Sequence, residues 1–237
     1  MGEASKVLFS LFGVLDVTGE VVAMWILLAV ITVICLIVRA NLKERPGVFQ
    51  NIVETGVEYL DNFFADALGR SKSRKYFCFL ASLFIFIIFA NYSGLIPGVG
   101  LTDYVKAPTS SFSVTIGLGI VAFAFLQYAG LRVGVKHYFK RFVTPMVFML
   151  PLLLLDEFIK PASLSLRLFG NVFGEETVTE KLYEILPIGA PVVMMALSVL
   201  FCALQAIVFT MLVSIYLDEA TEIEPVVPKV KKNQTET

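Results

Sequence analysis

Long uncharged apolar runs separated by short polar stretches form the pattern of the chain from residue 21 onward. Residues 21–38 carry no charge over 18 positions, a helix of about 27 Å against a hydrocarbon core of about 30 Å. Runs of similar length cover 76–96 and 112–131. The first run is too long for the apolar part of a signal peptide, and basic residues rather than a cleavage site follow it. The three runs predict transmembrane helices, with residues 1–20 as an external segment.

The last two apolar segments do not have the length of a simple span. In segment 142–183, the first fourteen residues are apolar but contain Pro145 and Pro151, and charged positions follow. Segment 185–217 has 33 residues and no charge, which is about 50 Å of helix. Such a helix must tilt steeply or begin outside the hydrocarbon core. A polar tail, 218–237, is expected to be solvated.

Residues 46–69 have a different pattern. Apolar side chains recur there at helical spacing, while Glu54, Glu58, Asp61 and Asp66 lie largely off that stripe. The pattern predicts an amphipathic helix at the membrane surface. A helix that binds lipid alone is usually rich in Lys and Arg on its polar face. The acidic face is compatible with contact to a partner protein or with packing on the chain's own bundle, and both interpretations stay open.

Composition supports an all-α integral membrane protein forming a single membrane domain. Hydrophobic residues make up 57% of the 237 residues and charged residues 16%, whereas soluble domains are about 25% charged. The net charge of −1 gives no field that would attract nucleic acid. Cys35, Cys78 and Cys202 all lie in apolar runs, which argues against a disulfide framework or a metal site and predicts small core residues.

Basic residues gather in the loops on one side of the predicted spans. They follow the first and third runs and precede the second: Arg39, Lys43, Arg45, Arg70, Lys72, Arg74, Lys75, Arg132, Lys136, Lys140 and Arg141. The excess of Lys and Arg in cytoplasmic loops predicts an external N-terminus and a cytoplasmic C-terminus.

A single cation, Arg167, lies in the otherwise uncharged stretch 162–174. A guanidinium at membrane depth costs at least about 2.5–3.5 kcal/mol, so it requires a counter-charge or an aqueous path. Ser163, Gly170, Asn171 and Gly174 share its helix face. This small, polar strip predicts close approach of another helix. The alternative is a side chain that snorkels to the interface, or a structural ion pair with a residue such as Asp156 or Glu157.

Acidic residues lie at both ends of this strip. Asp156 and Glu157 precede it, and Glu175 and Glu176 follow it. Carboxylates near a membrane segment can relay protons or line an aqueous vestibule, which suggests two access paths that meet near the arginine. The alternative for the second pair is an exposed interfacial turn.

Three polar or small residues share one face of the last segment. They are Ser198, Cys202 and Gln205, at i, i+4 and i+7. Gln205 is a candidate hydrogen-bond partner for Arg167 or Asn171. The alternative is a helix–helix hydrogen bond without any part in transport.

The motifs Ser165-Leu-Arg-Leu-Phe-Gly-Asn171, Leu204-Gln-Ala206 and Asn91-Tyr-Ser-Gly-Leu-Ile-Pro-Gly98 resemble the a subunit of rotary F-type ATP synthases, over roughly residues 20–220. The Gly174-Glu-Glu176 exit and the Asp156-Glu157 lead-in look most like bacterial and chloroplast-type members. The resemblance implies a fold in which the last two helices form a strongly tilted hairpin around a ring of c subunits.

The resemblance also implies roles. Arg167 would be the essential stator charge that ionises each passing c-subunit carboxylate and prevents leakage between two offset half-channels. Candidate pathway residues are Asn171, Glu175, Glu176, Gln205 and Ser198 toward the outside, and Ser163, Asp156 and Glu157 toward the cytoplasm. Some relatives carry a histidine or an acid at the position of Ser198, so the outer path differs in detail here.

The implied protein is not an enzyme on its own and needs no cofactor or metal. Its implied partners are the c-subunit ring, b-type subunits of the peripheral stalk, membrane lipid and the transported H⁺ or Na⁺. Its implied location is the bacterial inner membrane or an equivalent energy-coupling membrane. The runner-up function is a self-contained ion transporter with an intramembrane arginine, although no repeated half with broken helices is visible. An intramembrane hydrolase is disfavoured because its motifs are absent.

Overall fold

The computed structural model describes residues 7–11, 15–43, 46–95, 109, 111–134, 150–185 and 189–221. Its elements, in chain order, are β1 (Val7–Leu11), β2 (Leu15–Thr18), α1 (Gly19–Ala40), α2 (Val48–Leu68), α3 (Arg70–Ser93), α4 (Phe112–Val133), α6 (Leu150–Ile185) and α7 (Ala190–Thr221). Helices form nearly all of this regular structure, as the all-α class requires. Four of them contain segments long and apolar enough to cross a membrane: Val21–Ala40, Arg70–Ser93, Phe112–Val133 and Val193–Thr221.

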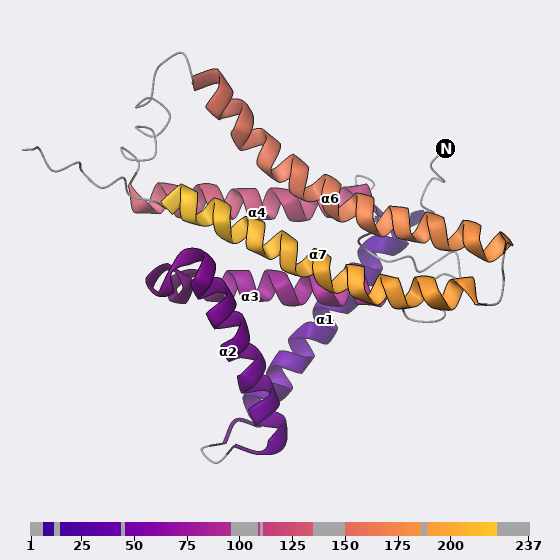
Figure 1. The fold of residues 1–237 in the computed structure, drawn as a ribbon, viewed down its shortest axis with the longest axis horizontal. Coiled ribbons are helices and arrows are strands. Elements are labelled where there is room, and N and C mark those ends of the chain that lie inside the picture. The colour runs from indigo at the N-terminus through magenta and orange to yellow at the C-terminus, as the bar shows by residue number, and fades with distance from the viewer. Residues whose placement is uncertain are drawn as a thin grey trace, which may run out of the picture.

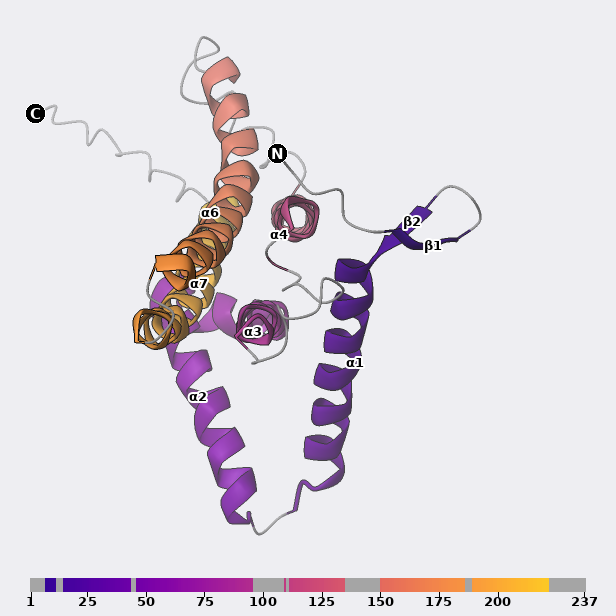
Figure 2. The same cartoon turned by 90° about the vertical axis from the view of Figure 1, so that its right-hand side faces the viewer.

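Helices α3, α4, α6 and α7 form the packed body of the molecule (Figure 1). Helix α7 contacts α3, α4 and α6, and α4 also packs on α6. Figure 2 shows α3 and α4 end-on, with α6 and α7 on one flank and α1 on the other. Helices α1 and α2 meet at one end and diverge as a V. Helices α3 and α4 therefore cover one side of the α6–α7 hairpin.

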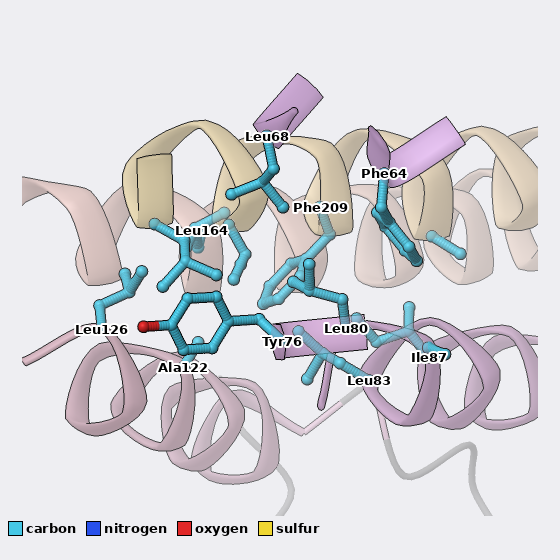
Figure 3. Close-up of a cluster of buried hydrophobic side chains, with 14 of the residues drawn as sticks. Phe64, Leu68, Tyr76, Leu80, Leu83, Ile87, Ala122, Leu126, Leu164 and Phe209 are labelled. Carbon is cyan, nitrogen blue, oxygen red and sulfur yellow. The ribbon is translucent and has the colours of Figure 1, made fainter. Parts of the chain in front are cut away.

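The core lies where α2, α3, α4, α6 and α7 converge. Figure 3 shows Leu80 and Tyr76 of α3 with Leu164 of α6 and Phe209 of α7 in one cluster. The rings of Phe79 and Phe125 stack between α3 and α4, with centroids 3.5 Å apart. Fully buried apolar side chains each contribute about 1.5–3 kcal/mol in water, but in lipid the close packing itself holds the helices together.

The predicted amphipathic helix corresponds to α2, and its two halves have different surroundings. Phe64 and Leu68 near its C-terminal end are buried and pack against α3 (Figure 3). Val48, Phe49 and Ile52 near its N-terminal end are exposed. Packing on the chain's own bundle therefore accounts for the C-terminal half only.

Gly69 makes the sharp junction between α2 and α3 possible. Its φ of 77° and ψ of 146° lie in a region that is essentially restricted to glycine. Helix α3 begins immediately afterwards at Arg70, so the basic residues that precede the predicted span form the first turns of the same helix.

The structure differs from the sequence predictions at several boundaries. The N-terminal segment contains an antiparallel hairpin in which Ser10 pairs with Asp16, which the apolar pattern did not indicate. Helix α6 includes Ile185, and α7 continues through Thr221 instead of ending at 217. The first residues of the predicted polar tail are therefore helical. Residues 142–149 of the predicted tilted segment lie outside the described residues.

The prediction that all three cysteines are core residues is wrong for two of them. Cys202 is buried, but Cys35 and Cys78 are exposed. Helix α1, which carries Cys35, has only 6% of its most apolar window buried inside the protein. Apolar composition of a membrane helix does not distinguish a lipid-facing position from a core position, and this explains the error.

Candidate functional site

Arg167 lies in the middle of α6, on a part of the helix that stays continuous despite Pro161. Its side chain is exposed. Within the described ranges it makes no hydrogen bond or ion pair. The charge is therefore available to a group that does not belong to the described part of this chain.

The strip around Arg167 is open. A Cβ atom added to Gly170 or Gly174 would meet no atom within 4 Å. Leu164 and Leu168, on another side of α6, are 1% and 0% exposed. No described helix of this chain therefore packs against these two glycines. The open strip of Arg167, Gly170 and Gly174 leaves room for a partner.

Among the described side chains, the contacts of three residue pairs join α6 to α7, and we call these contacts together the polar seam. Lys160 contacts Glu219 at 3.0 Å between Nζ and Oε2. Asn171 donates from Nδ2 to Oε1 of Gln205 at 2.6 Å. The Glu175 carboxylate lies beside the Ser198 hydroxyl. Residue numbers rise along α6 as they fall along α7, so the two helices are antiparallel, and each contact is one rung of the seam.

Arg167 falls in the gap between the first and second rungs. Phe209 and Thr210 lie on the intervening stretch of α7, and both are fully buried. The hydroxyl of Thr210 already donates to the Ala206 carbonyl at 2.8 Å. Residues 206–217 of α7 contain no acidic side chain, so this section of the helix supplies no counter-charge to Arg167.

The alternative ion pair between Arg167 and Asp156 or Glu157 is not formed. Both carboxylates instead face the ammonium group of Lys160. Its Nζ atom lies 3.9 Å from Oδ2 of Asp156 and 3.3 Å from Oε2 of Glu157. Glu157 is nearly buried, with 12% of its side chain exposed, whereas Asp156 retains 59%. The two neighbouring acids thus have different surroundings, and only Asp156 remains largely accessible.

The other predicted pathway residues lie along the seam or beside it. Gln205 and Ser198 are buried, as is Cys202 between them. Gln205 hydrogen-bonds Asn171 rather than Arg167. The Gln205 Nε2 atom is buried and has no protein partner among the described atoms. Ser163 is half-buried, one turn before Arg167. The backbone of Glu176 belongs to α6, but its side chain lies outside the described part of the structure.

Sequence reasoning missed the buried lysine and the close contact that fixes α6 on α4. Lys160 is only 7% exposed, although the sequence pattern assigned no separate role to it. A Cβ atom at Gly119 of α4 would overlap the Ser165 hydroxyl and lie 3.0 Å from the Pro161 carbonyl oxygen. A lone lysine seven residues before Arg167, on the same helical stripe, was the available signal for the first. The contact between Gly119 and α6 joins two separate helices, so the pattern within a single segment could not predict it.

Asn91 of α3 is a further polar residue in the core. It is 3% exposed, and neither its Oδ1 nor its Nδ2 has a partner in the described structure. Buried amide groups are normally satisfied by protein or by ordered water. The described residues contain no group of three or more His, Cys, Asp or Glu side chains that could hold a metal ion.

These features define a class: a polytopic helical membrane protein whose antiparallel hairpin carries a polar seam and presents one unpaired arginine on an open strip. The family model described as ATP synthase A chain matches residues 21–218. The chain belongs to this family.

Two algal proteins, both named ATP synthase subunit a, chloroplastic, are among its relatives. The Oedogonium cardiacum protein is 34% identical over 209 residues, covering 86% of this chain and 83% of the relative. The Stigeoclonium helveticum protein is 34% identical over 212 residues, covering 87% and 86%. The family forms the proton-translocating, non-catalytic subunit of the ATP synthase membrane sector, and membership implies assembly within that complex.

Proposed function

We propose that this chain is the stator of the membrane sector and that Arg167 acts as a fixed positive charge on the carboxylates of a ring of c-type subunits. The observation that carries the proposal is the unpaired, exposed guanidinium on an open strip. A c-subunit carboxylate that passes this charge is favoured in its ionised form and releases its ion, because an opposite charge within a few ångström stabilises a carboxylate. Arg167 stays protonated throughout, since guanidinium groups do not lose their proton in proteins.

Two offset half-channels complete the mechanism. The outer path uses Asn171, Glu175, Glu176, Gln205 and Ser198, and it is supported by the second and third rungs of the seam. The inner path uses Ser163, Asp156 and Glu157, of which Asp156 is the most accessible acid. The fixed charge of Arg167 between the two paths repels a cation and so prevents direct leakage. The transported ion is a proton or, with a suitable ring, Na⁺.

The same proposal sets the sidedness and the remaining partners. The N-terminus lies outside and the C-terminus in the cytoplasm, with the basic end of α3 at the cytoplasmic face. The membrane is a bacterial inner membrane or an equivalent energy-coupling membrane. The exposed, acidic N-terminal half of α2 receives a b-type subunit of the peripheral stalk.

Inverted membrane vesicles from cells that express the complex test the function. ATP-driven acidification is compared between the wild type, Arg167→Ala and the matched control Arg132→Ala, which changes an arginine at the C-terminal end of α4. The proposal predicts loss of acidification in Arg167→Ala, with assembled complex still present on a native gel, and nearly normal acidification in the control. Acidification near the wild-type level in Arg167→Ala would leave that residue with a structural part only.

A further inference from the structure

Lys160 is the most thoroughly enclosed charged side chain near the candidate site. Only 9% of its side chain is exposed. Its ammonium group lies 3.0 Å from Glu219 of α7 and 3.3 Å from Glu157, one turn earlier on α6. It also lies 5.3 Å from the centroid of the Tyr216 ring on α7. A lysine is rarely buried to this extent unless it is paired, and here it is paired with more than one acid.

The contacts of Lys160 extend to a third helix. Gln127 of α4 donates from Nε2 to Oε1 of Glu157 at 2.9 Å, while Oε2 of the same carboxylate faces Lys160. Both oxygens of Glu157 are thus engaged, one by α4 and one by the lysine. Lys160 therefore lies at the centre of a network, the lysine cluster of Lys160, Glu157, Glu219 and Gln127, which joins α4, α6 and α7.

The lysine cluster and Arg167 occupy one stripe of α6. Seven residues separate Lys160 from Arg167, which places them on the same face about 10 Å apart along the axis. The other two rungs of the seam, at Asn171 and Glu175, both lie on the opposite side of Arg167. Without the lysine rung, the seam would hold the arginine from one side only.

We propose that Lys160 is a positioning residue: it fixes the register of α6 against α7 and α4 and so holds Arg167 on the open strip. The effect on transport rests on the proposed function of Arg167, whereas the effect on helix register does not. In this arrangement the Glu157 carboxylate is held in a fixed position in the inner path by Gln127 and Lys160. Asp156 is then the acid through which the inner path opens.

The exposed ion pair between Lys72 and Asp218 provides a matched control. It also joins a lysine to the C-terminal end of α7, at 2.6 Å, but its side chains retain 33% and 39% exposure. Exposed pairs contribute little to stability, whereas leaving one member of a buried pair uncompensated is strongly destabilising. Lys72→Met should therefore be nearly silent where Lys160→Met is not.

The test uses the assembled complex and two separate readouts. The native cysteines Cys35, Cys78 and Cys202 are replaced by alanine, and spin labels are placed at Leu166 on α6 and Met211 on α7, both of which are exposed. The label-to-label distance distribution reports helix register, and ATP-driven acidification in inverted vesicles reports transport. The variants are Lys160→Met, Lys160→Arg and Lys72→Met, with Glu219→Gln as the milder variant if Lys160→Met does not assemble.

In Lys160→Met we expect a shifted or broadened distance distribution and a loss of acidification of about tenfold or more, because a misplacement of about 1 Å at a reacting group can cost a hundredfold. Glu219→Gln should change both readouts in the same direction. Lys160→Arg, which keeps the charge, should restore both readouts, and Lys72→Met should match the wild type.

An unchanged distance distribution in Lys160→Met, or in Glu219→Gln where it replaces that variant, would overturn the proposal, as would a changed distance with full acidification. Failure of Lys160→Arg to restore register would do the same. Retained acidification in Arg167→Ala would instead count against the proposed function, and the distance readout would still decide the part that Lys160 plays in register.

Discussion

Arg167 and Lys160 show how two cations on one stripe of a helix acquire opposite surroundings. Lys160 is enclosed by carboxylates of α6 and α7. Arg167, two turns later, faces an open strip, and residues 206–217 of α7 beside it contain no acidic side chain. Retaining an unpaired cation at this depth is costly. The cost is explained if the partner charge comes from another subunit.

At the same scale, the Asn171–Gln205 hydrogen bond can be tested by Gln205→Leu. The leucine removes the acceptor for Asn171 and the buried donor that has no protein partner in the described structure. We expect a stability loss of about 1 kcal/mol, the usual size of such bonds in membranes, together with slower ATP-driven acidification. Thermal unfolding of the purified complex and vesicle acidification measure the two effects.

Leu204→Ala is the control for that experiment because Leu204 is the exposed neighbour on α7. It should leave acidification unchanged. Equal acidification in Gln205→Leu and the wild type would remove Gln205 from the proposed outer path.

At the scale of elements, the approach of α4 to α6 depends on one glycine. A methyl group at Gly119 would overlap the Ser165 hydroxyl and crowd the Pro161 carbonyl, whereas at Gly117 it would meet nothing within 4 Å. We expect Gly119→Ala to destabilise the protein by about 1–3 kcal/mol through overpacking. Gly117→Ala should be neutral or stabilising by up to about 1 kcal/mol, because alanine favours a helix.

Denaturation of the two glycine variants in detergent compares them directly, with Ser165→Gly as a partner substitution. In the double variant Gly119→Ala/Ser165→Gly, removal of the serine side chain should recover part of the lost stability. The packing argument would be wrong if Gly119→Ala and Gly117→Ala unfolded alike.

Helical spacing alone predicted the face that carries Arg167 and Asn171, and it singled out Gln205 as a partner on the last helix. It left open whether Gln205 meets Asn171 or Arg167, because that depends on the register of two helices. The Lys160–Glu219 contact joins residues 59 positions apart and requires α7 to continue beyond residue 217. A polar sequence after an apolar run is compatible both with a solvated tail and with a last helical turn that contacts another helix. The pattern of the sequence therefore could not predict this contact.

At the scale of the whole molecule, the division of α2 into a packed half and an exposed half is the basis for the proposed docking of a stalk subunit. Glu54 and Glu58 lie on its exposed part. Cysteines introduced at these positions should cross-link to a b-type subunit in the assembled complex. A cysteine at Ile120, exposed on α4, serves as the control. Efficient cross-linking of Ile120 but not of residues 54 and 58 would place the stalk elsewhere.

The central claim is that the fixed charge of Arg167 both drives ion release and separates two access paths. The most direct test is passive proton flux through the membrane sector after removal of the catalytic sector, in vesicles with an imposed potential. The account predicts that Arg167→Ala raises this passive flux above the wild-type level while abolishing ATP-driven acidification, and that Arg167→Lys leaks less than Arg167→Ala because a positive charge remains. Wild-type passive flux together with wild-type acidification in Arg167→Ala would contradict it.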